Sequence, residues 1–358
     1  MYYSYFFYIL NYMDEFKIND SRNYKDFKIF TFSNYLRSKV KSELIKSLHE
    51  SILEPSCYWS IELLCSGHFY DIWHILLLYM AKYIHISNPK LPIYLNNRLE
   101  VFKNIIKSTN YDEIHLRNNN HLRCLFAEII TIVCTSKKNN VMENYSLKNN
   151  EDFDINNLQF KLKAPNINYG KLIFKEDDPR EIFIAVNEFM YHISEDSKDK
   201  YYACYWLEWI IKYDINSRNL KRNCECERRS FVPVEDKFQK NIIWLIFDGL
   251  FYTNKDKLVK EILNSLLNLF CLRYNFSSNK TKKYLIYFGI SLLTDIVDFS
   301  LPIIKDKKIL KNIISNINII YKQVKKSEKG DDMDYLYKNI NEEKTNKKID
   351  IMNSILNV

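Results

Sequence analysis

The chain has 358 residues, of which 47% are hydrophobic, and its formal net charge at pH 7 is +8. A chain of this length can bury a substantial core, in one large helical unit or in two closely packed ones. Its five glycines include no closely spaced pair, which excludes a P-loop and a dinucleotide-binding loop, because both cradle phosphate with the backbone of nearby glycines.

The predicted elements are helical almost throughout from residue 31 onward. An apolar residue recurs at every fourth position of the first helix: Leu36, Val40, Leu44, Leu48 and Ile52. We expect Pro55 to end this helix. A short helix over 58–66 follows, stopped by Gly67 in the position that a helix C-cap favours, and a second helix covers 69–84.

A helix that begins near Pro92 and a helix over 121–134 come next. Residues 136–177 are rich in Asn and lack apolar periodicity, which predicts a surface insertion. Within it, "LQFKL" (158–162) and "KLIF" (171–174) could form a small β-hairpin.

In "DDPREIFIAV", Asp178 is a suitable N-cap and Pro179 a suitable first helical residue, so a helix is predicted over 179–193. Further helices are expected at 197–214, 234–252, 255–274, 279–299 and 306–326. The predicted fold class is therefore all-α, with an antiparallel multi-helix bundle or layered helical hairpins.

The predicted organisation has five parts: an N-terminal extension (1–30), a helical half (31–135), the Asn-rich insertion (136–177), a second helical half packed on the first (178–327) and a charged tail (328–358). Met13 is an alternative start to Met1, because "MDEFKIND" resembles an ordinary N-terminus.

The densest apolar stretch, "CYWSIELLCSGHFYDIWHILLLYMAKYIHI", raises the question of a membrane span or a metal site. Its uncharged run Ile72–Ala81 is too short to cross a bilayer, which needs about 20 residues. The stripe formed by positions 71, 74, 78, 82 and 85 is polar except at Leu78, which predicts a mostly buried helix with one polar edge. His74 and His85 lie about 16 Å apart along such a helix and cannot share a metal ion.

Eight cysteines form no disulfide pattern, and most lie in apolar helical runs, which favours a reducing intracellular compartment. Cys224 and Cys226 in "LKRNCECERRS" are weak metal candidates, because no second Cys or His pair follows. An exposed linker is the expected structure there. No catalytic motif, cofactor or small-molecule substrate is predicted.

Two groups of basic residues are candidates for phosphate contacts in a nucleic-acid complex. The first group is Arg218, Lys221, Arg222, Arg228 and Arg229, and the second is Lys280, Lys282 and Lys283. Because the first group lies in the same polar segment as the two cysteines, its expected structure is a solvated linker.

Five acidic residues stand inside apolar runs: Glu62, Glu128, Glu208, Asp248 and Asp295. A di-iron helical bundle would need Glu-x-x-His motifs on two helices, and the three glutamates lack that histidine. We expect these acids to lie at helix edges or to pair with Arg98, Arg117 or Arg123, because an unpaired buried charge is costly.

Five blocks of the sequence resemble a known family. They are "SCYWSIELLCSGHFYDIWHILLLYMAKYIHISNPKLPIYL", "RCLFAEIITIVC", "ACYWLEWIIKYD", "FQKNIIWLIFDGLF" and "KKYLIYFGISLLTD". At these blocks the chain resembles an uncharacterised family of helical proteins encoded by giant, Mimivirus-like nucleocytoplasmic large DNA viruses. The resemblance implies an intracellular viral protein in the host cytoplasm, the viral factory or the virion, and it implies no catalytic residue.

The predicted function is a non-enzymatic helical scaffold or adaptor in a viral assembly, with protein partners and no membrane span. It rests on the lack of a visible catalytic motif and on aromatic side chains suited to partner helices. The alternative is a nucleic-acid-associated accessory factor of viral replication or transcription. A third hypothesis is an enzyme whose catalytic residues are distant in the sequence and come together only in the folded structure.

Overall fold

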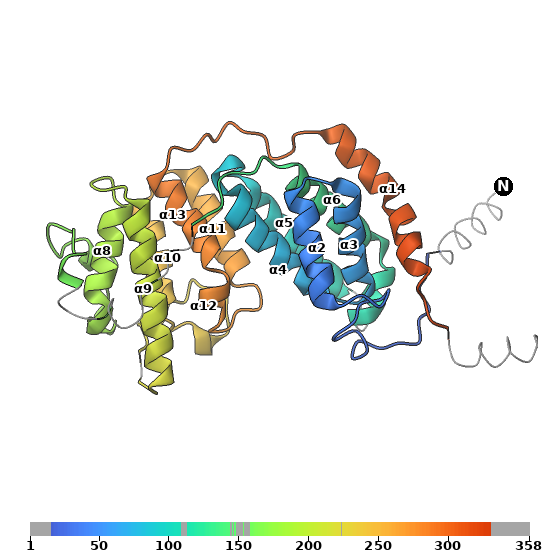
Figure 1. The fold of residues 1–358 in the computed structure, drawn as a ribbon. Coiled ribbons are helices and arrows are strands. Elements are labelled where there is room, and N and C mark those ends of the chain that lie inside the picture. Colours follow the sequence, from blue (N-terminus) through green and yellow to red (C-terminus); the bar gives the residue numbers. More distant parts are fainter. Residues whose placement is uncertain are drawn as a thin grey trace, which may run out of the picture. The chain divides into compact units, whose positions relative to one another are not determined.

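The computed structural model describes residues 16–108, 113–143, 145, 147, 153, 158–222 and 224–330. These residues form helices and no strand, with two isolated antiparallel bridges, Phe30–Leu36 and Glu225–Asn241 (Figure 1). The all-α prediction is thus confirmed. The alternative start at Met13 and most of the predicted tail lie outside the described residues.

The chain folds into two compact units, each built from segments far apart in the sequence. Unit 1 comprises 1–73, 102–134 and 306–358, and unit 2 comprises 74–101 and 135–305. These boundaries differ from the sequential halves expected from the sequence. The last helix, α14 (Lys307–Lys325), belongs to unit 1, where it packs on α3 (Leu53–Cys65).

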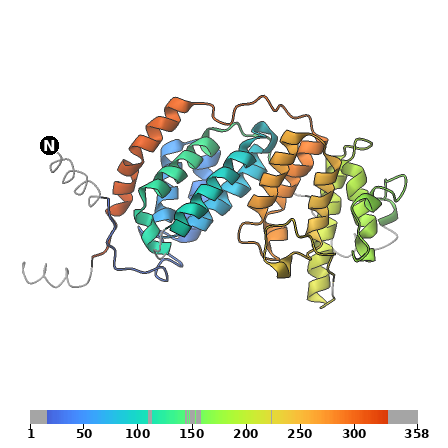
Figure 2. The same cartoon turned by 180° about the vertical axis from the view of Figure 1, so that it is seen from behind.

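Unit 1 is a group of helices around an aromatic core. Its other elements are α2 (Arg37–His49), the start of α4 (Phe69–Tyr79), the end of α5 (Leu91–Ser108), the 3₁₀-helix η3 (Glu113–Asn118) and α6 (Asn120–Thr135). The ring of Phe102 in α5 packs 5.7 Å from Trp73 in α4 and 5.7 Å from Phe126 in α6, measured between centroids. Figure 2 shows α6 beside α14 from behind.

The first two helices follow the predicted apolar pattern with changes at their ends. Val40, Leu44 and Leu48 of α2 are fully buried, whereas the expected stripe residues Leu36 and Ile52 flank the helix and are exposed. The prediction that proline at position 55 ends a helix is wrong, because this residue lies in the first turn of α3, where a missing N–H costs nothing.

Gly67 ends α3 as the sequence predicts. Its φ of +76° is the left-handed conformation that glycine adopts without strain. The N–H of His68 donates to the Leu63 carbonyl and the N–H of Gly67 to the Leu64 carbonyl, which is the Schellman pattern.

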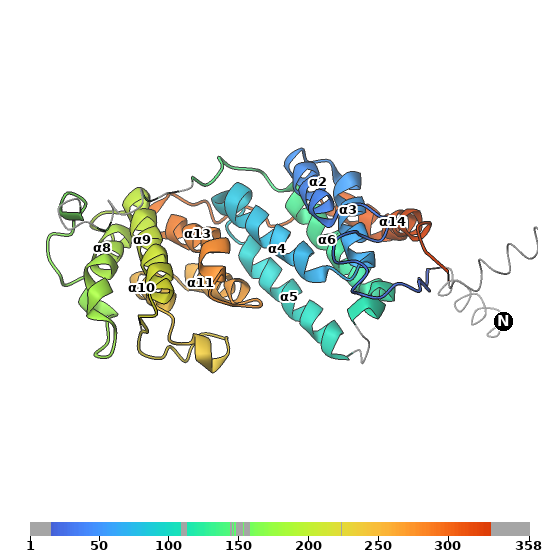
Figure 3. The ribbon, with the colours of Figure 1, turned by 60° about the horizontal axis from the view of Figure 1, so that its bottom comes forward.

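Unit 2 contains the remaining helices. They are the π-helix η1 (Met80–Ile84), the 3₁₀-helices η2 (His85–Ser87), η5 (Gly170–Leu172), η6 (Arg180–Ile182) and η7 (Asp236–Phe238), and the α-helices α8 (Phe183–Ile193), α9 (Lys200–Asn219), α10 (Ile243–Thr253), α11 (Lys257–Phe270), α12 (Ser278–Thr281) and α13 (Lys283–Thr294). Helices α8 and α9 pack as a hairpin, and α13 packs on α9 and α11 (Figure 3).

The densest apolar stretch is a mostly buried helix, as predicted. The side chains at 71, 74, 78 and 82 are half-buried, while the residues between them are mostly buried. His85 departs from the predicted polar edge and is buried, because the helix changes to η1 before it. Among the described residues, none of the helices has the length and apolar character needed to cross a bilayer.

Two local predictions between residues 158 and 193 are wrong. The segments 158–162 and 171–174 contain helical turns and do not form a hairpin. Asp178 is not the N-cap of α8, which begins at Phe183 after η6. Its carboxylate instead accepts hydrogen bonds from the backbone N–H of Lys175 and Glu227.

Gly249 sets how closely α10 approaches α8. A Cβ atom at this position would lie 2.6 Å from Met190 Sδ and 3.2 Å from Phe189 Cε1. We predict that Gly249→Val lowers the free energy of unfolding by about 1–3 kcal/mol, because the larger side chain overpacks this crossing. Urea unfolding of the full chain measures the loss.

The matched control is Tyr252→Val on the same helix, where the side chain is 53% exposed. We expect this substitution to change the free energy of unfolding by no more than about 0.5 kcal/mol. Equal effects at positions 249 and 252 would contradict the close helix crossing.

Candidate functional site

Arg229 lies buried in an ion triad, so the prediction of a solvated linker is wrong at this residue. Its guanidinium binds Asp178 through Nη2 at 2.7 Å and Nη1 at 3.0 Å, and its Nε lies 2.6 Å from Asp248 Oδ2. Although burial lowers the pKa of Arg229, the hydrogen bonds and charges of the two carboxylates raise it above its usual value. The triad joins the segment before η7 to α10 and to the residues before α8.

Four other basic candidates also bind groups of unit 2. Arg218 Nη2 lies 2.5 Å from Asp214 Oδ2, and Lys283 Nζ lies 2.7 Å from Glu208 Oε1. Arg228 binds Gln239 and Asp236, and the buried Lys282 donates to the Phe270 and Leu272 carbonyls at the end of α11. The three remaining basic candidates have exposed side chains: Lys221, Arg222 and Lys280.

The two cysteines of the same segment are poorly placed for a metal. Cys224 is half-buried, and Cys226 is buried with its Sγ 3.3 Å from the Asn241 carbonyl oxygen. Burial raises the pKa of each thiol to about 12, so each is a neutral thiol at pH 7 when no metal is bound. Within the described ranges, no three His, Cys, Asp or Glu side chains are grouped as a metal site.

Four of the acids in apolar runs are held by groups other than the predicted arginines: Glu62, Glu208, Asp248 and Asp295. Glu62 accepts hydrogen bonds from the N–H and Oγ of Ser33, both at 2.7 Å. Asp295 pairs with Lys200 at 2.8 Å. As described above, Glu208 pairs with Lys283 and Asp248 with Arg229. None of these four acids pairs with Arg117 or Arg123.

A serine, a histidine and a glutamate also meet in unit 2. His192 Nδ1 lies 3.0 Å from Ser197 Oγ, and His192 Nε2 lies 3.5 Å from Glu188 Oε2. The backbone N–H groups of Ser197 and Lys198 both donate to the Ser194 carbonyl, so neither is free to stabilise an oxyanion. Glu188 accepts from the backbone at 163 and 164, which indicates a structural role.

The most distinctive site is a cleft of unit 1 that we call the arginine cleft. It consists of two adjoining cavities of about 730 and 410 Å³. Residues 17–21 and 115–119 line the first cavity. Residues 16–17, 118–121, Arg123 and Asn318 line the second, so Lys17, Asn118 and Asn119 line both.

Two asparagines and a tyrosine fix the walls of the arginine cleft. Asn119 caps α6 by accepting from the Leu122 N–H at 3.2 Å. Asn118 exchanges two hydrogen bonds with the backbone of Ile18, at 2.8 and 3.0 Å, which holds the segment 17–21 against η3. From α14, the Tyr321 hydroxyl donates to the Arg117 carbonyl and to Asn118 Oδ1, each at 3.2 Å.

Arg117 lines the first cavity without a carboxylate partner among the described residues. It is 3% exposed, and its hydrogen bonds to described residues run to the carbonyl oxygens of Cys65 and Asp20, both at 3.4 Å. Among the same residues its Nε has no hydrogen-bond partner. Burial lowers the pKa of Arg117 below its usual value, yet guanidinium groups stay protonated in proteins.

Arg123 lines the second cavity and, like Arg117, is buried without an ion-pair partner among the described residues. It is 3% exposed and bonds neutral oxygens, of which Asn318 Oδ1 at 3.1 Å is the nearest. Its guanidinium lies 4.1 Å from the ring centroid of Tyr321. As for Arg117, the described residues provide no carboxylate as an ion-pair partner.

The carboxylates nearest to Arg117 are engaged elsewhere. Asp20 binds Arg22 through both oxygens, at 2.8 and 2.6 Å. Although burial raises the pKa of Asp20, these bonds and the Lys329 N–H lower it below its usual value. Glu328 accepts a hydrogen bond from the Asn19 N–H.

From the sequence, Arg117 and Arg123 are expected only as partners for buried acids. The available signal was the run "HLRNNNHLR" (115–123), which combines basic and amide side chains at a helix start. A helix N-terminus rich in such groups favours anions.

Comparison of the chain with protein-family models, with curated protein sequences and with solved structures finds no significant match. The resemblance to proteins of giant DNA viruses therefore stays a prediction.

Arg229 and Arg228 provide a test of the difference between a buried ion triad and an exposed ion pair. We predict that Arg229→Met lowers the free energy of unfolding by about 3–5 kcal/mol, because two carboxylates lose their shared cation. The control is Arg228→Met at the neighbouring position, whose pair with Asp236 is exposed and contributes at most about 1 kcal/mol. Urea unfolding compares the two variants, and similar losses would contradict the buried triad.

Proposed function

We propose that the protein is a non-enzymatic helical binding protein and that its arginine cleft binds a phosphate-bearing ligand. The proposal rests on one observation: Arg117 and Arg123 are both buried at the cleft and lack a carboxylate partner among the described residues. A buried cation without a counter-charge is costly, and a bound anion removes that cost.

The chemistry of the cleft suits a tetrahedral oxyanion. Each guanidinium has five N–H donors in a planar fork that matches phosphate oxygens. Arg117 uses two of these donors in long bonds to carbonyls. Lys17 and His115 line the same cavity, and the positive end of the α6 dipole adds to the attraction for an anion.

The proposed binding function fits an adaptor more closely than an enzyme. The cleft offers mainly cationic and amide groups, which suit binding of an anion, and the Asp20 carboxylate that also lines it is held by Arg22. The resemblance found in the sequence supports a role for such a protein as a scaffold or adaptor in a viral assembly.

Phosphate is predicted to stabilise the full chain against thermal unfolding. Phosphate at 100 times its Kd adds about 2.7 kcal/mol to the free energy of unfolding, because it binds only the folded state. We expect this gain when phosphate replaces chloride at constant ionic strength, and we expect Arg117→Met to abolish it. Thermal unfolding followed by circular dichroism measures both effects.

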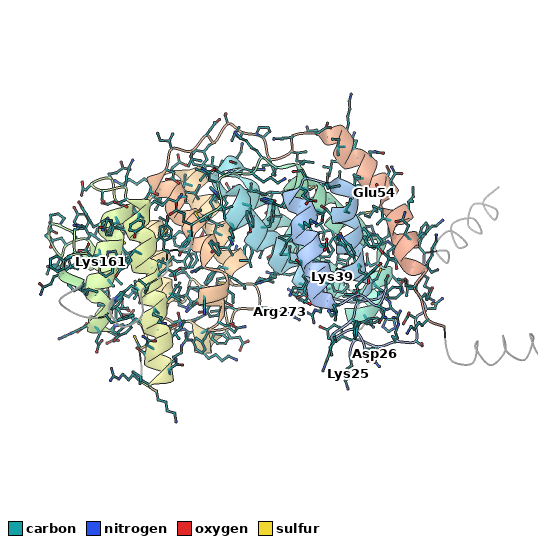
Figure 4. The ribbon with its side chains drawn as sticks, in the orientation of Figure 1. Lys25, Asp26, Lys39, Glu54, Lys161 and Arg273 are labelled. Atoms are coloured by element: carbon teal, nitrogen blue, oxygen red, sulfur yellow. The ribbon has the colours of Figure 1, made fainter. Side chains whose placement is uncertain are left out.

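Two controls separate specific binding from general electrostatics. Lys25→Met removes an exposed charge from the same unit, on a loop that projects away from the helices, and should keep the phosphate effect (Figure 4). Without phosphate, Arg117→Met should be at least as stable as the natural chain, because it removes an unpaired buried charge. A large loss of stability in that variant, or a phosphate effect that survives it, would contradict the proposal.

A further inference from the structure

The arginine cleft is divided into two parts, and each part has its own buried guanidinium. Arg117 lines only the larger cavity, and Arg123 lines only the smaller one. Lys17, Asn118 and Asn119 line both, so the two cavities share a wall. An anion in one cavity therefore has a second cation-lined cavity directly beside it.

One phosphate group satisfies only one of these sites. The two guanidinium groups come from different elements, since Arg117 is in η3 and Arg123 is in the first turns of α6. Within the part of the chain that the structure describes, Arg117 has a buried Nε without a hydrogen-bond partner, and Arg123 bonds only neutral oxygens. The charges of Asp20 and Glu328 only partly offset the lowering of the Arg117 pKa by burial, and both carboxylates are bound elsewhere, so each guanidinium can take a counter-charge from a ligand.

The shared wall is suited to a group that bridges the two cavities. Lys17 is exposed and lines both cavities, so its ammonium group is available to both parts of a bridging ligand. The Asn119 side chain is occupied by its capping bond to the Leu122 N–H, and Asn118 by its bonds to Ile18. The wall is therefore fixed in shape, which holds the two arginine sites at a constant separation.

We infer that the arginine cleft contains two adjacent anion subsites and selects ligands with two linked phosphate groups, of the diphosphate class, over ligands with one. This inference rests on the proposed phosphate-binding function. Arg117 defines one subsite and Arg123 the other, and Lys17 lies between them. The linked ligand gains from both subsites with a single loss of translational freedom.

The test is isothermal titration of the full chain with inorganic orthophosphate and with inorganic diphosphate, at equal ionic strength and without divalent metal. We expect diphosphate to bind at least about tenfold more tightly, which corresponds to about 1.4 kcal/mol. In Arg117→Met and in Arg123→Met, separately, diphosphate should bind about as weakly as orthophosphate binds the natural chain.

Variants distinguish two linked subsites from a general charge effect. Diphosphate has more charge than orthophosphate, so a diffuse basic surface would keep its preference in each single variant. Lys25→Met, which removes an exposed charge, should leave both affinities unchanged. Arg123→Lys keeps the charge but loses the planar fork, and should weaken diphosphate binding while the fold is retained.

The outcomes separate this inference from the proposed function. Equal affinities for the two ions, or a diphosphate preference that depends on only one of the two arginines, would overturn the inference of two subsites and leave phosphate binding intact. No binding of either ion would overturn the proposed function as well.

Discussion

The requirement that a buried guanidinium find a counter-charge organises both the fold and the candidate site of this protein. Arg229 meets the requirement inside unit 2, where Asp178 and Asp248 bind it from two sides and so tie the segment before η7 to α10. In unit 1, the half-buried Arg22 forms an ion pair with Asp20. Arg117 and Arg123 are buried like Arg229 but face cavities and neutral oxygens, and this difference is the physical basis for an anion site.

The arginine cleft depends on segments that are distant in the sequence. The side chain of Arg123 at the start of α6 reaches Asn318 of α14, 195 residues later, and Tyr321 of the same helix holds the end of η3. On the other side, the segment 17–21 is fixed by Asn118. Packing of α14 on α3 therefore positions the α14 side chains that line and support the cleft. The cleft is complete only when unit 1 has assembled.

Periodicity was sufficient to predict the helices, because apolar spacing of three and four residues reports directly on which face is buried. It fixed the core face of α2 and the end of α3 at Gly67. It failed where a side chain had a distant partner. Asp178 has the local features of an N-cap, but the long-range pair with Arg229 takes its carboxylate, and the helix starts later.

The candidate site was harder to predict for the same reason. The run 115–123 shows basic and amide residues, but the sequence contains no signal that Arg117 and Arg123, among the described residues, form no ion pair with a carboxylate once the chain has folded. Conversely, most of the basic residues between 218 and 229 looked available for phosphate, yet the fold pairs Arg218, Arg228 and Arg229 with acids of unit 2. Whether an arginine is paired is a property of the tertiary structure.

A crystal structure of the full chain soaked in selenate, a tetrahedral oxyanion whose selenium gives an anomalous signal, tests the proposed anion site directly. We expect an anomalous peak in the arginine cleft, with a selenate oxygen accepting a hydrogen bond from Arg117 Nε. A cleft without a peak, or a peak confined to exposed lysines, would contradict it.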